Sequence, residues 1–193
     1  SLDNFSLQSR LKELREQRTN LAYEMVSKLQ KDGYGLKWSE VEKVANPHAA
    51  ISKGHIMRAL HEHKNGEMEW PEIAQLFQRN GVAYLPFLEH PLEEAIDLIY
   101  QCGGVPVLAH PGLLRDLQLV MDILDKSNIG LEVYYGYWVR RNELIEIFAN
   151  MAQEKALLAT GGSDFHALGG VVNMGDIEVP EKCVTSILAH LED

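Results

Sequence analysis

The chain has 193 residues, of which 46% are hydrophobic, and it carries a formal net charge of -10. This length and hydrophobic content suit one buried core with a small appendage and exclude a disordered chain. The acidic balance argues against a protein that coats nucleic acid, and two widely separated cysteines form neither a disulfide framework nor a zinc knuckle. We find no signal peptide and no apolar run of about 18 residues, so we expect a cytoplasmic protein that does not enter a membrane.

Helical patterns dominate the first part of the chain. Apolar residues recur at three- and four-residue spacing from Leu11 to Gln30, and residues before them are mostly polar. Further helices are expected over residues 37–45, 54–63 and 70–80. We therefore predict that residues 1–11 are a linker and that residues 12–86 form a small all-helical subdomain.

Strands alternate with helices in the second part of the chain. Expected strands end near His110, Tyr135 and Asp164, and a last short strand is expected at residues 177–180. Expected helices cover residues 91–100, 114–126, 142–154 and 183–191. This alternation predicts an α/β fold with a parallel sheet, whose strands carry functional residues at their carboxyl ends.

Four polar residues follow or lie near those carboxyl ends: His110, Glu132, Asp164 and His166. If the chain stays extended, Asp164 and His166 point the same way and can bind one metal ion while Phe165 packs on the opposite side. The alternative is a strand end with a solvated aspartate and a histidine that caps a loop. His61 and His63 have the same spacing, but on a helix such residues diverge by about 200°.

The motifs resemble those of the PHP (polymerase and histidinol phosphatase) superfamily of metal-dependent phosphoesterases, and most closely its TrpH/YciV-like group. The segments that carry the resemblance are residues 107–112, 130–134 and 160–166, with a further motif at residues 52–60. The resemblance implies the carboxyl half of a distorted (β/α)7 barrel at residues 87–193. It also implies that residues 12–86 are a helical insert that acts as a lid. A complete barrel of this general kind needs about 250 residues, and we find no strand that bears the His-x-His pair of the family.

The resemblance also implies roles for individual residues. His110, Asp164 and His166 match catalytic metal ligands of the family, and Glu132 is either a ligand or a residue that holds a ligand histidine. The donors are nitrogen and oxygen, which suit manganese, iron, zinc or magnesium without selecting one of them. Divalent manganese is the ion that we expect. Lys53, His55 and Arg58 match residues that grip a substrate phosphate; the alternative is a basic helix start that faces water.

What the resemblance implies for function is metal-dependent hydrolysis of a phosphate ester in the intact protein. The expected substrate is a small phosphorylated nucleotide, such as a 3',5'-bisphosphonucleotide, or the 5' end of a short single-stranded RNA, but not duplex DNA. A second interpretation is a catalytically silent PHP-like binding or regulatory module that has lost its first ligands. A third is another PHP phosphatase such as histidinol phosphatase, which the helical insert disfavours.

Overall fold

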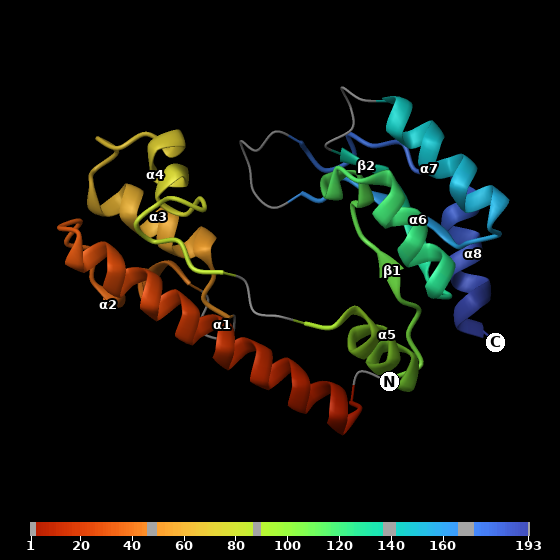
Figure 1. Ribbon diagram of the computed structural model, residues 1–193, viewed down its shortest axis with the longest axis horizontal. Helices are drawn as coiled ribbons and strands as arrows, with labels where there is room; N and C mark the ends of the chain where they lie inside the picture. The colour runs from red at the N-terminus through yellow and green to blue at the C-terminus, as the bar shows by residue number, and fades with distance from the viewer. Residues whose placement is uncertain (1–2, 46–49, 87–89, 137–141, 166–171, 193) are drawn as a thin grey trace. The chain divides into compact units, whose positions relative to one another are not determined.

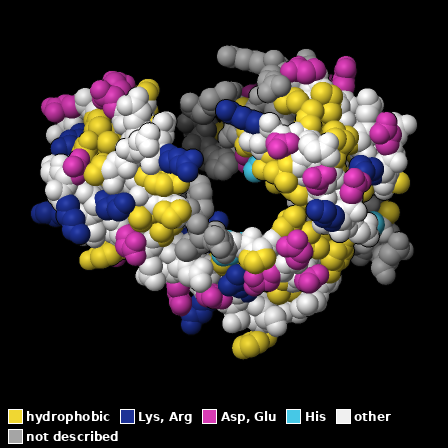
Figure 2. Space-filling view, viewed as in Figure 1, with side chains coloured by type: hydrophobic (Ala, Val, Ile, Leu, Met, Phe, Trp, Pro, Cys, Tyr) yellow, Lys and Arg dark blue, Asp and Glu magenta, His cyan; other side chains and the backbone are white. Residues whose placement is uncertain are grey.

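The computed structural model describes residues 3–45, 50–86, 90–136, 142–165 and 172–192. The chain divides into two compact units, one formed by residues 2–91 and the other by residues 92–193 (Figure 1). On the visible surface of each unit, charged side chains of both signs are interspersed with apolar ones (Figure 2). Among the described residues, none of the helices combines the length and apolar character that a bilayer span requires.

The first unit is helical. Its helices are α1 (Phe5–Lys31), α2 (Trp38–Val44), α3 (Lys53–His63) and α4 (Trp70–Leu76). The three short helices gather beside the carboxyl-terminal part of α1, coloured orange in Figure 1. That part of α1 supplies Ala22, Met25, Val26 and Leu29 to the core, which the short helices complete with Val41, Ile56, Leu60 and Ile73. The unit therefore has a hydrophobic core of its own.

Helix α1 begins earlier than the sequence predicts, so the expectation of a linker at residues 1–11 is wrong for residues 5–11. Asn4 caps the helix, because its side chain accepts a hydrogen bond from the Leu7 backbone N–H at 3.1 Å. No residue of α1 before Ala22 is buried. The early turns therefore pack into no core, and local contacts rather than burial must stabilise them.

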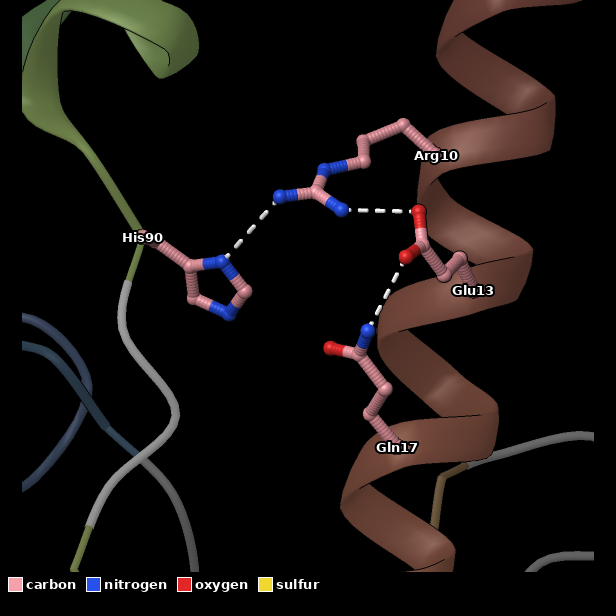
Figure 3. Close-up of polar contacts among 4 residues, drawn as sticks. All are labelled: Arg10, Glu13, Gln17 and His90. Atoms are coloured by element: carbon pink, nitrogen blue, oxygen red, sulfur yellow. Dashed lines mark hydrogen bonds and ion pairs between the residues drawn. The ribbon is translucent and has the colours of Figure 1, made fainter.

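Side-chain pairs stabilise these early turns instead (Figure 3). Arg10 donates to the Glu13 carboxylate at 2.7 Å, and the Gln17 amide donates to the same carboxylate at 3.0 Å. The Arg10 guanidinium also lies 3.4 Å from Nδ1 of His90, a residue 80 positions away in the sequence. Pairs three and four residues apart support an exposed helix face, and the contact with His90 holds the end of this unit against α1.

The second unit is an α/β structure. Its elements are α5 (Leu92–Gln101), β1 (Val107–Leu108), a 3₁₀ helix (Pro111–Leu114), α6 (Leu117–Lys126), β2 (Gly130–Tyr135), α7 (Asn142–Glu154), β3 (Ala159–Gly162) and α8 (Glu181–Glu192). The strands form one parallel sheet in the order β1-β2-β3. This confirms the parallel sheet that the alternation of strands and helices predicts.

The core of the second unit lies between the sheet and two of its helices. Val120 and Leu124 from α6 and Phe148 from α7 are buried with Leu131 and Val133 of the central strand. Two strand predictions are wrong, one in its extent and one altogether. The strand before His110 has only two paired residues, and residues 177–180 are not a strand, although their β-branched residues suggested one.

Candidate functional site

The carboxyl ends of the three parallel strands bring together His110, Tyr135 and Asp164. His110 lies two residues after β1, Tyr135 is the last residue of β2, and Asp164 lies two residues after β3. The Tyr135 hydroxyl donates to Oδ2 of Asp164 at 2.5 Å. The centroids of the His110 and Tyr135 rings are 5.4 Å apart, with an angle of 55° between the planes. Tyr135 therefore contacts His110 and Asp164, two of the three predicted ligands.

Glu132 holds the backbone of the segment that carries His110. The His110 N–H donates to Oε2 of Glu132 at 2.6 Å. His110 has a left-handed backbone conformation with φ 34°, which side-chain-bearing residues rarely adopt, so this bond fixes a strained turn. Burial raises the pKa of Glu132, and repulsion from Asp164 adds to this effect, while the His110 N–H opposes it. Of the two roles predicted for Glu132, this geometry favours positioning of the histidine segment.

The backbone at Asp164 differs from the expectation. Asp164 has φ 52°, in the left-handed region, so the chain is no longer extended there. The argument that Asp164 and His166 point the same way because the segment is extended is therefore wrong. His166 itself lies outside the described residues. Within the described ranges, no three His, Cys, Asp or Glu side chains are placed to hold one metal ion.

The donor atoms of the described residues at this site fit a divalent metal ion. Asp164 offers a carboxylate and His110 an imidazole, and no thiolate is present. Such nitrogen and oxygen donors suit manganese, iron, zinc or magnesium. The Tyr135 hydroxyl orients the Asp164 carboxylate, as residues behind metal ligands commonly do.

Lys53, His55 and Arg58 lie in the helical unit on α3, the first two in its first turn and Arg58 in its middle. Both Oγ of Ser52 and its backbone N–H lie 3.0 Å from Nδ1 of His55, so this imidazole caps its own helix. Nε of Arg58 donates to Oε1 of Glu62 at 2.9 Å on the exposed surface. The Lys53 side chain makes no hydrogen bond or ion pair with the described residues. The structure thus leaves Lys53 as the least engaged of the three predicted phosphate-binding residues.

The pair His61 and His63 is not a metal-binding His-x-His motif. Both residues are on α3, as their helical pattern predicts. His61 stacks on Trp70, with ring centroids 4.5 Å apart. Nδ1 of His63 lies 2.8 Å from Oε1 of Glu40. The two imidazoles therefore serve separate contacts within the helical unit.

Tyr135 is the residue that sequence reasoning missed. A tyrosine at the end of an apolar strand resembles an ordinary core residue, and its ring is fully buried. The available signal is its position, because Gly136 follows it at the carboxyl end of the central strand, where the site was predicted.

No family model matches the chain. Among characterised proteins, the chain is 31% identical over 160 residues to the 5'-3' exoribonuclease Rnm of Salmonella typhimurium, covering 80% of this chain and 52% of the relative. It is 29% identical over 189 residues to the 3',5'-nucleoside bisphosphate phosphatase of Chromobacterium violaceum, covering 92% of this chain and 64% of the relative. The chain therefore spans roughly half to two thirds of the length of these relatives.

Two solved structures are similar over nearly the whole chain. One, described as a metal-dependent phosphoesterase from Bifidobacterium adolescentis, gives a TM-score of 0.82 at 25% identity and covers 97% of this chain and 68% of that one. The other, an amidohydrolase from Chromobacterium violaceum with bound sulfate, gives a TM-score of 0.77 at 26% identity and covers 98% of this chain and 69% of that one.

Together, these likenesses and the parallel sheet define an α/β fold like that of the phosphoesterase and the amidohydrolase, and it corresponds to part of a barrel. The similarity to these phosphoesterases over most of the chain supports the resemblance of its motifs to the PHP superfamily. The resemblance of its motifs, and the partial barrel that they imply, are confirmed.

Proposed function

We propose that the intact protein is a metal-dependent phosphoesterase that hydrolyses a phosphate ester of a nucleotide. The observation that carries the proposal is the convergence of His110 and Asp164 on Tyr135 at the carboxyl ends of adjacent parallel strands. His110, Asp164 and His166 are the proposed ligands, and manganese is the proposed metal, with zinc, iron or magnesium as alternatives. Similar proteins that cleave phosphate esters support the reaction type.

The described residues of the candidate site have separate roles in this proposal. A bound divalent ion would supply Lewis acidity to the phosphoryl group. Asp164 would hold the ion with a carboxylate that the Tyr135 hydroxyl keeps in one orientation. Glu132 would keep His110 at the rim of the sheet by accepting its backbone N–H.

The proposed substrate is a small nucleotide, such as a 3',5'-bisphosphonucleotide, or the 5' end of a short single-stranded RNA. The names of two relatives support these two substrates, because one is a nucleoside bisphosphate phosphatase and the other a 5'-3' exoribonuclease. In this proposal residues 12–86 act as a helical insert and residues 87–193 are the carboxyl half of the barrel. The protein works in the cytoplasm, and neither a membrane nor duplex DNA is its partner.

A second candidate is a silent PHP-like module that binds a ligand without turning it over. The observation that favours it is the absence of a three-donor cluster among the described residues. Two donors would bind one ion weakly and would not build a multinuclear centre.

Metal content and turnover separate the two candidates. Elemental mass spectrometry of the purified chain is combined with phosphate release from adenosine 3',5'-bisphosphate in the presence of manganese. The test variant is Asp164→Ala, and the matched control is Asp97→Ala on the exposed surface of α5. Bound metal and turnover that Asp164→Ala alone abolishes would support the enzyme. No metal and no turnover in any variant would fit either the silent module or an enzyme whose other ligands lie outside this chain. Upstream codons for a strand with a His-x-His pair would then separate these two.

A further inference from the structure

The second unit contains a pocket of about 510 Å³ that lies apart from the candidate metal site. Residues of α7, α8, β2 and β3 line it (Figure 1). Leu157 and Leu158 precede β3 and Ala159 is its first residue, so the pocket reaches the amino end of that strand. His110 and Asp164 instead follow the carboxyl ends of β1 and β3 and do not line the pocket.

The inner wall of this pocket is apolar, and the core holds it in place. Ala152 of α7 is 5% exposed, and Ala149 of the same helix and Leu157 pack against the same core cluster. Alanine side chains are short, so they leave a space that longer apolar residues would fill. Since well-packed interiors have few voids larger than a water molecule, a space of this size beside a fixed apolar wall suits the apolar body of a small ligand.

Helix α8 supplies most of the polar lining. Lys182 and Ser186 are four residues apart, with Cys183 between them, so all three lie on one face of the helix. Gln153 of α7 adds an amide. Among the described residues that line the pocket, Lys182 is the only charged one, and it makes no ion pair with any residue that the structure describes. The pocket therefore combines an apolar wall with one positive charge and neutral hydrogen-bonding groups.

The Cys183 thiol is a buried polar group in this lining. The residue is only 2% exposed, its cysteine is free, and its sulfur makes no hydrogen bond with the described residues. Burial raises the pKa of the thiol, and the positive charge of Lys182 opposes this effect. At neutral pH the thiol is therefore a neutral, weak hydrogen-bond donor without a partner in the part of the chain that is described.

We propose that this pocket binds a small organic carboxylate with an apolar body. The body would cover the alanine and leucine wall, and the carboxylate would accept hydrogen bonds from the Lys182 ammonium and the neutral donors beside it. One cation matches one negative charge, so in a chain with a net charge of -10 a monoanion fits better than a phosphate dianion. An uncharged apolar molecule would leave the ammonium without a partner.

Titration calorimetry of the purified chain tests the proposal without metal or turnover. The probes are octanoate and phenylbutanoate, which carry a linear and an aromatic body, with octanol, octylammonium and inorganic phosphate as comparisons. We expect both carboxylates to bind and octylammonium and phosphate not to bind. Octanol should bind about fivefold more weakly than octanoate, a modest difference because Lys182 is exposed and solvent screens its charge.

Two substitutions separate the charge of the pocket from its wall. Lys182→Gln should weaken octanoate binding about fivefold and leave octanol binding unchanged, because it removes the charge alone. Ala149→Leu should weaken the binding of both about tenfold, because the longer side chain occupies the space. Lys126→Gln, at an exposed lysine of α6 outside the pocket, is the matched control and should change neither affinity. Circular dichroism checks that each variant folds.

Three results would overturn the proposal. Octanol that binds as tightly as octanoate, or octanoate binding that is insensitive to Lys182→Gln, would show that the pocket does not recognise the carboxylate. Binding that is insensitive to Ala149→Leu would place the ligand elsewhere. No binding of either carboxylate at millimolar concentration would show that the pocket is not a carboxylate site. Asp164→Ala should leave octanoate binding unchanged, so failure of the phosphoesterase proposal and failure of this one are distinguishable.

Discussion

The hydroxyl of Tyr135 is a single group on which the geometry of the candidate metal site depends. It donates to Asp164 at 2.5 Å from a fully buried ring. A hydrogen bond to a charged group contributes about 1.5–3 kcal/mol, so Tyr135→Phe should lower the free energy of unfolding by about 1–2 kcal/mol at neutral pH. Urea denaturation measures the difference.

The adjacent tyrosine provides the control for this change. The Tyr134 hydroxyl has no hydrogen-bond partner among the described residues, so Tyr134→Phe should leave the stability within about 0.5 kcal/mol. Equal effects of the two substitutions would show that the bond to Asp164 contributes nothing measurable.

The residues at the rim of the sheet could be predicted to different extents. His110 and Asp164 could be predicted because chain order and parallel pairing place successive strand ends at one edge. The left-handed backbone at Asp164 could not, because it depends on tertiary packing around the residue rather than on a local pattern. The capping role of His55 had a local signal, since it occupies the third position after Ser52, where capping-box side chains reach back to the N-cap N–H.

The pairing of β2 with β3 depends on a close approach at Gly161. A Cβ atom added there would lie 2.4 Å from the Tyr134 carbonyl oxygen and 2.5 Å from its Cβ. Both strands would have to separate, because a backbone atom cannot move aside alone. We expect Gly161→Ala to destabilise the protein by about 1–3 kcal/mol, as overpacked sites do, measured by urea denaturation.

The next residue in the same strand is the matched control. A Cβ at Gly162 would meet no atom within 4 Å. Gly162→Ala should therefore change the stability by less than about 0.5 kcal/mol. If Gly162→Ala were as harmful as Gly161→Ala, loss of glycine in the strand, rather than contact with Tyr134, would be the cause.

Helices α2 and α3 are joined by a contact that depends on pH. The hydrogen bond with His63 lowers the pKa of the Glu40 carboxyl, and the bond from the Lys37 N–H lowers it further. Since the folded pKa is below the ordinary value of 4.5, this contribution is complete above that value and is lost as the pH falls through the folded pKa.

The expected difference between wild type and Glu40→Gln is about 0.5 kcal/mol at pH 7, because both side chains are partly exposed. It should shrink below about pH 4.5, and denaturation curves at several pH values measure this trend. A difference that grew as the pH fell would contradict the assigned direction of the pKa.

Elements with a strong apolar period could be predicted, and elements without one could not. The expected bounds of α7, Asn142–Glu154, agree with the structure because an uninterrupted amphipathic pattern defines both ends. The start of α1 could not be found this way, because Phe5 is 85% exposed and packs into no core. The 177–180 segment has strand-like composition but forms no strand among the described residues, so local propensity was overridden there.

On the scale of the whole molecule, the second unit leaves apolar and backbone groups uncovered. Helix α5 has an apolar side, yet none of its ten residues is buried. In the described part of the chain, β1 and β3 each pair with β2 alone, so each has one free edge. Unpaired edges with accessible N–H and C=O groups recruit other strands, which barrels prevent by closing.

We therefore predict that this chain associates with itself as its concentration rises. Multi-angle light scattering across a range of concentrations should show a mean mass above the 21.8 kDa of the chain. Thr160→Lys places a charge on the edge strand β3 and should shift the protein towards the monomer, because edge lysines oppose strand addition. Asn20→Lys adds the same charge to the exposed surface of α1 and should not. A monomer at every concentration would mean that other residues of the chain protect these edges. The three-stranded sheet would then be stable without a further strand at β1 or β3.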